Sequence, residues 1–360
     1  MMNNIIRYAY NTKINLSNFD NKVWNKFIEI IRVKSFKKVY LDFQNVEFVA
    51  PLVLPRLCYM GVCASRLGVE LEIIINGVSD LKSYLAQLGF FDIVKKYKIL
   101  TIDEGTTGGE IKKDNATKAF FCFNKEEILR KYGEQYEIEG QWSEKDILKV
   151  YIRMELLGQS YKNEGLDRKM ISQSKVLSVL QNISHDYKIL EDIALDYVEL
   201  IHNSIWHGNA LCFFALQVGQ YENKYHDGYF KKVEVSIMDT GKGLYQSLIN
   251  KDWLKENKTT QCIELDSFKQ LKSIHAQDFY SAIEMIFYRK NEKIRGVYQV
   301  MDSMREKQEV KLILTNRSAR MEFDEYGLKM VMDKNLQLKQ FVDWYDIINM
   351  GFGMDISFNI

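Results

Sequence analysis

One stretch, Leu195 to Ala210 (LDYVELIHNSIWHGNA), constrains the fold of this 360-residue chain more than any other. On an α-helix each residue turns by about 100°, so Glu199, Asn203 and His207 fall within roughly 80° of one another. The opposite face carries four apolar residues, Leu195, Val198, Ile201 and Ile205. The pattern predicts an amphipathic helix that lies on a core and presents a carboxylate, a carboxamide and an imidazole along its other side.

A second stretch follows this helix and completes the pattern. Residues 233–238 (VEVSIM) alternate and are rich in β-branched side chains, which predicts a buried strand. The strand runs into residues 239–243 (DTGKG), where glycines permit positive φ and close approach of the backbone to a ligand. A helical carboxylate can deprotonate an attacking water, and a carboxamide oxygen is a good ligand for Mg²⁺. The two stretches therefore predict a site for a metal-bound triphosphate.

The spacing Glu-x3-Asn-x3-His, followed by a strand and Asp-x-Gly-x-Gly, resembles the N box and first glycine box of the GHKL ATPases. This superfamily includes histidine-kinase catalytic domains, gyrase B and the heat-shock chaperones. The resemblance implies that Glu199 is the water-activating base, that Asn203 holds Mg²⁺ and that Asp239 binds the adenine amino group. It also implies that Gly241 and Gly243 bind the nucleotide, with ATP and Mg²⁺ as cofactors.

A degenerate second glycine box follows later in the chain. Residues 294–300 (IRGVYQV) resemble the family's Arg-Gly-x-Gly-Leu, with Tyr298 and Gln299 in place of the second glycine and the leucine. Arg295 can meet phosphate charge, and Gly296 lets the backbone approach it ahead of a helix whose N-terminus favours an anion. Both residues are therefore expected to bind the nucleotide.

A threonine hydroxyl often assists the adenine-binding aspartate in this family, just before the final strand. Here Met354 occupies that place. Thr315, at the end of the run KLILT, is expected to supply the hydroxyl instead, with Thr240 as the alternative source.

The two histidines of the central helix receive different interpretations. His207 either orients Glu199 or touches phosphate as part of the catalytic machinery, or it is an ordinary residue near a helix C-terminus, where the dipole favours a cation. The sequence leaves both interpretations open. His202 lies about 100° from the polar face and is expected to be structural.

Bulk composition excludes several classes of protein. The chain has 49 Lys and Arg residues against 48 Asp and Glu residues, so it lacks the excess of positive charge that is typical of a nucleic-acid binder. The five cysteines are odd in number and lack metal-site spacing, which favours thiols in a reducing compartment. Because the chain shows neither a signal-peptide pattern nor a run of eighteen apolar residues, we expect a cytoplasmic protein without a membrane contact.

The N-terminal part alternates strands and helices, which implies a parallel or mixed sheet covered by helices. We expect strands at residues 5–8, 38–43 and 70–75 and helices at 21–33, 57–67 and 80–88, with Gly68 and Gly89 ending the last two helices. The pattern over residues 1–100 resembles a STAS domain. Where that family has a phosphorylatable serine, this chain has Ala50-Pro51-Leu52, so the domain is expected to dock a protein partner or to self-associate rather than to be phosphorylated there.

The chain thus divides into four segments by pattern. Residues 1–100 form the STAS-like domain, and the polar, glycine-rich residues 101–118 form a linker. Residues 119–174 form a connecting region with a strand at 119–123 and a helix at 144–157. Residues 175–360 form the GHKL domain, with a first helix at 175–183 and strands at 211–220, 233–238, 311–315 and 354–360, the first two of which pair.

The sequence therefore predicts a protein of the α/β and α+β classes, in which a STAS-like α/β domain precedes a GHKL, Bergerat-type α/β sandwich. The expected function is an ATPase whose MgATP binding and hydrolysis drive a conformational or assembly switch in a cytoplasmic regulatory or defence pathway. Two alternatives stay open. The STAS-like neighbour suggests an anti-sigma-type protein serine kinase acting on a separate partner, and the degenerate second glycine box suggests an ATP-sensing scaffold with little turnover.

Overall fold

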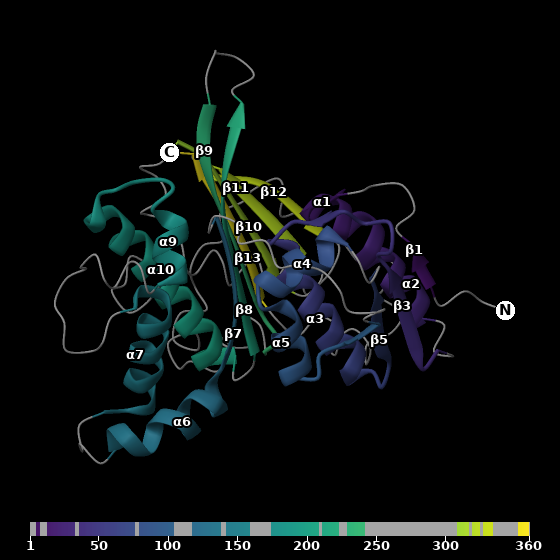
Figure 1. Cartoon of the computed structure of the whole chain (residues 1–360), viewed down its shortest axis with the longest axis horizontal. Coiled ribbons are helices and arrows are strands. Elements are labelled where there is room, and N and C mark those ends of the chain that lie inside the picture. Colours follow the sequence, from purple (N-terminus) through teal and green to yellow (C-terminus); the bar gives the residue numbers. More distant parts are fainter. Residues whose placement is uncertain are drawn as a thin grey trace, which may run out of the picture. The chain divides into compact units, whose positions relative to one another are not determined.

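The computed structural model describes residues 5–7, 13–32, 36–75, 79–103, 117–137, 142–158, 174–208, 211–222, 229–241, 308–316, 319–324, 327–333 and 352–359. These residues form a mixed α/β protein (Figure 1). The contacts between residues divide it into two compact units. The first consists of Met1–Cys122 and Phe213–Gln217, and the second of Phe123–Cys212 and Val218–Ile360. Within the described ranges, no helix has both the length and the apolar character that crossing a bilayer requires.

The first unit contains a four-stranded sheet in the order β1-β3-β5-β6, in which every neighbouring pair is parallel. Its strands are β1 (Ile5–Arg7), β3 (Lys38–Asp42), β5 (Glu70–Ile74) and β6 (Thr101–Asp103). The first three lie where strands were expected, and the parallel order confirms the predicted architecture, because parallel neighbours need crossover connections. β6 is formed by the first residues of the expected linker.

Helices and a short second sheet complete this unit. They are β2 (Lys13–Ile14), α1 (Leu16–Asn18), the π-helix η1 (Phe19–Trp24), α2 (Asn25–Arg32), β4 (Phe48–Val49), α3 (Val53–Arg66), α4 (Asp80–Gln87) and α5 (Phe90–Lys96). Gly68 and Gly89 have φ of 69° and 73°, which confirms the two predicted helix stops. α3 begins four residues earlier than expected, because Pro55 lies in its first turn, where a missing N–H costs nothing.

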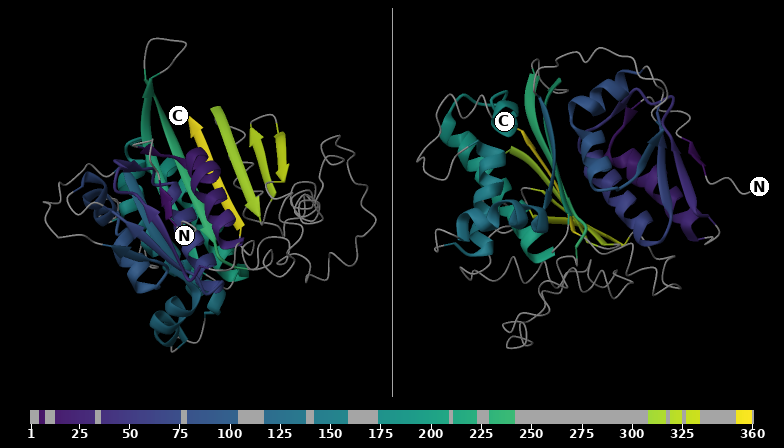
Figure 2. Two further views of the ribbon diagram at one scale, coloured as in Figure 1. Left: turned by 90° about the vertical axis from the view of Figure 1, so that its right-hand side faces the viewer. Right: turned by 60° about the horizontal axis from the view of Figure 1, so that its bottom comes forward.

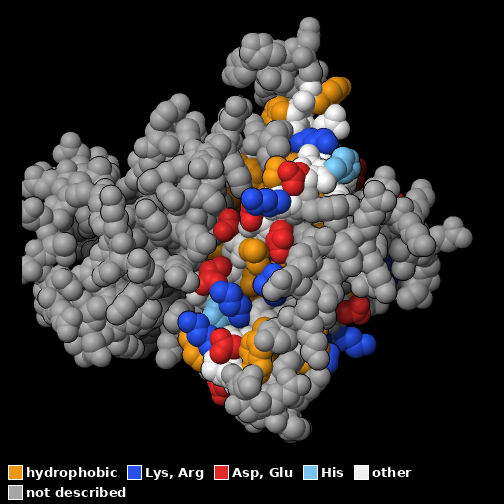
Figure 3. Space-filling model, turned by 90° about the vertical axis from the view of Figure 1, so that its left-hand side faces the viewer, with side chains coloured by type: hydrophobic (Ala, Val, Ile, Leu, Met, Phe, Trp, Pro, Cys, Tyr) orange, Lys and Arg blue, Asp and Glu red, His pale blue; other side chains and the backbone are white. Residues whose placement is uncertain are grey.

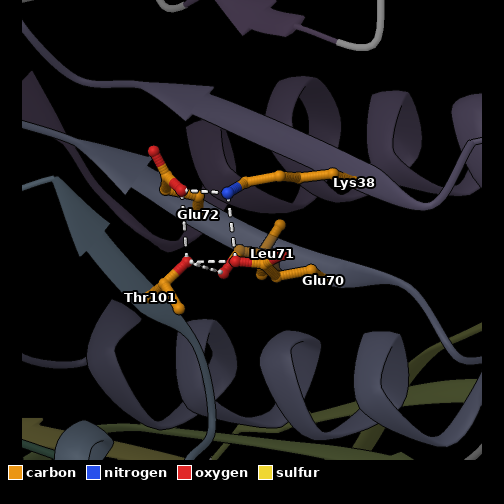
Figure 4. A network of polar contacts seen from close by, with 5 residues as sticks. All are labelled: Lys38, Glu70, Leu71, Glu72 and Thr101. Carbon is orange, nitrogen blue, oxygen red and sulfur yellow. Dashed lines mark hydrogen bonds and ion pairs between the residues drawn. The ribbon is translucent and has the colours of Figure 1, made fainter.

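A polar network joins the first residues of three parallel strands (Figure 4). The Lys38 ammonium lies 2.5 Å from a Glu72 carboxylate oxygen and 3.0 Å from one of Glu70. The Thr101 hydroxyl donates to Glu70 over 3.1 Å. The hydrogen bonds that Lys38 donates to the carboxylates of Glu72 and Glu70 raise its pKa well above the usual value. Lys38 of β3, Glu70 of β5 and Thr101 of β6 thereby hold one end of the sheet in register.

A seven-stranded sheet has the order β12-β11-β10-β13-β9-β8-β7. Its strands are β7 (Lys118–Asn124), β8 (Leu211–Glu222), β9 (Tyr229–Asp239), β10 (Gln308–Asn316), β11 (Ala319–Asp324), β12 (Gly327–Asp333) and β13 (Phe352–Asn359). The neighbouring positions of β8 and β9 confirm the pairing expected from the sequence. The ladder from β9 through β13 to β10 is antiparallel, and the buried Ser236 hydroxyl donates across it to Asp355 over 2.6 Å.

Helices cover one face of this sheet (Figure 2). They are α6 (Lys125–Glu137), α7 (Glu144–Leu157), α9 (Lys175–Leu180) and α10 (Tyr187–Gly208), and α10 contacts both α7 and β9. α7 has the bounds that its pattern predicts. Ser143 caps its start through a reciprocal capping box with Asp146, and Gly158, with φ of 65°, caps its end.

Gly61 provides a test of the packing in the first unit. A Cβ added at this α3 position would lie 2.6 Å from the backbone oxygen of Ile99 and 2.7 Å from its Cγ2. Gly61→Ala should therefore lower the free energy of unfolding by roughly 1–3 kcal/mol, although alanine is the better helix former. The measurement is urea denaturation of the full chain. Ser65→Ala, at an exposed position of the same helix, is the control, and equal stability of the two variants would contradict the close packing.

Candidate functional site

The central helix α10 has the two faces that its sequence predicts, except that Leu195, expected on the buried face, is partly exposed. Val198, Ile201 and Ile205 are buried, whereas Glu199 and Asn203 are partly exposed. His207 lies in the last turn of the helix, and its side chain is outside the described residues. The structure thus brings Glu199 and Asn203 to one face, one turn apart, as expected for a helix.

The exit of β9 forms a buried polar turn. The side chains of Asp239 and Thr240 are only 4% and 2% exposed. Oδ1 of Asp239 accepts a hydrogen bond of 2.9 Å from the backbone N–H of Gly241, which is the geometry of an Asx turn. The predicted carboxylate therefore stands at the end of a buried strand, with its orientation fixed by the glycine that follows.

Thr240 joins the end of β9 to the start of β8. Its backbone N–H donates to the carbonyl of Leu211 over 3.0 Å, and its Oγ1 accepts from the N–H of Leu211 over 3.2 Å. Leu211 follows Gly208, the last residue of α10, by three residues, a span of at most about 11 Å. We call these two hydrogen bonds the Leu211–Thr240 clamp. The clamp holds the Asp239 turn beside the start of β8, within three residues of the C-terminal end of α10.

The two candidate threonines occupy different positions. The Thr240 hydroxyl is engaged with the backbone of Leu211, so the structure gives it a structural role. Thr315 lies in β10 and pairs with Gly353 of β13, which in turn pairs with Met238 of β9. Its backbone is thus two strands from β9, and its side chain is outside the described residues.

A lysine outside both sequence motifs contacts the polar face of α10, and no sequence pattern predicts it. Nζ of Lys149, on α7, lies 2.7 Å from Oε2 of Glu199. The Glu199 side chain is 19% exposed and that of Lys149 is 53% exposed. The two residues are fifty positions apart, so only the packing of α7 against α10 reveals the contact.

The opposite flank of α10 buries His202, as the prediction of a structural role requires. Its side chain is 1% exposed, and its ring stacks on that of Trp206 with centroids 6.5 Å apart. Nζ of Lys125 lies 4.3 Å from the centroid of Trp206, a cation–π contact. Burial lowers the pKa of His202 to about 4, with Lys149 and Lys145 acting in the same direction and Glu199 opposing them.

Charge on this face is mixed in sign. Figure 3 shows the side on which the helical layer lies, where lysine and arginine side chains alternate with aspartate and glutamate and with hydrophobic groups. Two ion pairs join α7 to α10, namely Lys149–Glu199 and Arg153–Glu191, the second with 3.4 Å between Nη2 and Oε1. Side chains of α7 therefore pair with carboxylates on the polar face of α10, so the charge on this face depends on both helices.

Asn203 and Asp239 carry the donor types that the predicted magnesium-bound nucleotide requires. Mg²⁺ in such sites is held by one or two protein oxygens together with substrate phosphates and water, and the carboxamide of Asn203 can supply such an oxygen. The buried carboxylate of Asp239 can accept a hydrogen bond from an amino group, which a low-dielectric site strengthens. Gly243, Arg295 and Gly296, expected to bind the nucleotide, lie outside the described residues.

Comparison of the chain with protein-family models, with curated proteins and with solved structures found no match.

His202 should make stability depend on pH in a defined direction. Because its pKa falls from 6.5 to about 4 on folding, the unfolded chain takes up a proton first as the pH drops. The stability that His202 contributes is thus complete above pH 6.5 and is lost toward pH 4. His202→Phe should remove this loss. As the pH falls over that range, the free energy of unfolding of the variant should therefore rise relative to that of the wild type by up to about 1.4 kcal/mol per pH unit.

The measurement is urea denaturation of both proteins at several pH values between 7 and 4. His185→Phe, at an exposed histidine that precedes α10, is the control and should run parallel to the wild type. A constant difference between wild type and His202→Phe across this range would contradict the buried, neutral state of the imidazole.

Proposed function

We propose that the second unit is an ATP-binding, GHKL-type ATPase domain. In this proposal Glu199 activates the attacking water, Asn203 holds Mg²⁺ and Asp239 binds the adenine amino group. The observation that carries the proposal is the Leu211–Thr240 clamp, because it ties the start of β8, three residues after the helix bearing the first two residues ends, to the turn bearing the third. The structure thus supports a single site, although the two motifs are separate in sequence.

The chemistry assigned to each side chain follows from its surroundings. Glu199 is partly exposed, so its carboxylate can meet a water molecule and take its proton as the water oxygen bonds to the γ-phosphorus. The bond from that phosphorus to the bridging oxygen breaks, and ADP leaves with the bridging oxygen. Bound Mg²⁺ would offset charge on the phosphate oxygens. Asn203 and Asp239 orient the two ends of the nucleotide.

Nucleotide binding and hydrolysis are proposed to drive a conformational or assembly switch in a cytoplasmic regulatory or defence pathway. The STAS-like N-terminal unit would be the docking or self-association module. Its parallel sheet with α3 packed on β5 supports an independent module. The segment corresponding to the family's phosphorylated loop carries Ala50 and Leu52 and no hydroxyl, which favours constitutive docking.

Turnover of ATP by the full chain tests the assignment of roles. The wild type should release phosphate from MgATP, and Glu199→Ala should lower kcat by about 10²–10⁴-fold, because it removes the general base. Asp239→Asn should instead weaken nucleotide binding, since the single carboxamide oxygen cannot serve both the N–H of Gly241 and the adenine amino group. Equal rates for wild type and Glu199→Ala would contradict hydrolysis at this site.

The same assay separates the proposal from its two alternatives. Transfer of the γ-phosphate to a serine of a partner, with little free phosphate, would indicate a protein kinase. Tight MgATP binding with negligible turnover in wild type and Glu199→Ala alike would indicate a sensor.

Cross-linking of the full chain, alone and with proteins that co-purify with it, tests the docking role. We expect intermolecular cross-links to involve lysines of the N-terminal unit such as Lys26, Lys82 and Lys95, which lie in α2, α4 and α5. Cross-links confined to lysines of α7, such as Lys145 and Lys149, would assign the interface to the second unit instead.

A further inference from the structure

We propose that Lys149 is a positioning residue that orients the carboxylate of Glu199 for water activation, an inference that rests on the ATPase function proposed above. Its motivating observation is the 2.7 Å contact between Nζ of Lys149 and Oε2 of Glu199, which joins α7 to α10. α7 lies outside both sequence motifs, so this contact adds a component to the site that neither motif contains.

The geometry leaves Glu199 able to act. A lysine ammonium donates as a compact point charge, whereas an arginine fork engages both oxygens of a carboxylate. Lys149 contacts Oε2, so Oε1 of the same carboxylate can face a water molecule. Holding a general base in one rotamer keeps it within hydrogen-bond reach of the proton that it abstracts.

The helix that carries Lys149, α7, is anchored along its length. Ser143 and Asp146 form the capping box at its N-terminus, with a 2.5 Å hydrogen bond between the two side chains. Ile147 and Ile152 are buried within the unit. Near its C-terminus, the Ser174 hydroxyl donates to the carbonyl of Leu156. The backbone that carries Lys149 is thus fixed beside α10, within reach of Glu199.

A second ion pair between the same two helices supplies a matched control. Arg153 lies one turn after Lys149 on α7 and pairs with Glu191 of α10. Their side chains are 43% and 23% exposed. The exposures are close to those of Lys149 and Glu199, at 53% and 19%. Both pairs tie α7 to α10, but only one involves the proposed base. A purely structural role for Lys149 would therefore be shared by Arg153.

The test compares steady-state ATP hydrolysis and MgATP binding for full-length variants. Lys149→Met should lower kcat about tenfold, because a displaced base loses reach, while the nucleotide Kd stays within about twofold. Lys149→Arg should recover part of the rate by restoring the charge. Arg153→Met should leave kcat within about twofold of wild type. In a Glu199→Ala background, Lys149→Met should have no further effect on kcat, as a double-mutant cycle requires of a residue acting through another.

Each contrary result has a distinct meaning. Equal kcat for Lys149→Met and Arg153→Met, or an additive effect of Lys149→Met on Glu199→Ala, would overturn the positioning role while wild-type turnover leaves the ATPase function standing. Wild-type turnover no higher than that of Glu199→Ala would overturn the proposed function, and the inference with it. If Lys149→Met alters the urea denaturation curve, Lys149→Gln, which keeps a polar end at this half-exposed position, replaces it in the same comparison.

Discussion

The Leu211–Thr240 clamp is the contact on which the candidate site depends. Two hydrogen bonds, of 3.0 and 3.2 Å, fix the end of β9 against the start of β8, and β8 begins three residues after α10 ends. Loss of the Thr240 hydroxyl would leave the part-buried N–H of Leu211 without this acceptor, at a cost of about 1–3 kcal/mol.

Apolar packing, rather than charge, holds α7 and α10 together. Full burial of one isoleucine or valine is worth about 1.5–3 kcal/mol, and Ile152 of α7 and Ile201 of α10 are both fully buried. An ion pair as exposed as Lys149–Glu199 contributes roughly 0.2–1 kcal/mol. The ion pair therefore adds little to the free energy of unfolding. Its proposed effect is on the orientation of the Glu199 carboxylate.

Sequence patterns predicted the elements whose ends or faces are marked by local residue signals. The helix at residues 144–157 has a serine cap and a terminal glycine, and the central helix has a continuous apolar stripe. Several of the missed elements lack such local signals. The helix α6 is highly charged, β6 is a short polar edge strand, and β11 and β12 are recognised through their ladders. The same limit applies to the site. Glu199, Asn203 and Asp239 follow from local spacing, whereas Lys149 becomes visible only when α7 packs against α10.

A crystal structure of the full chain with Mg²⁺ and a non-hydrolysable ATP analogue tests the proposed nucleotide site most directly. We expect the carboxamide oxygen of Asn203 to ligate the metal, the adenine amino group to donate to Asp239, and Glu199 to face the γ-phosphate. A nucleotide bound away from these residues, or Asp239 and Asn203 lying on opposite sides of the bound nucleotide without contacting it, would rule out this site.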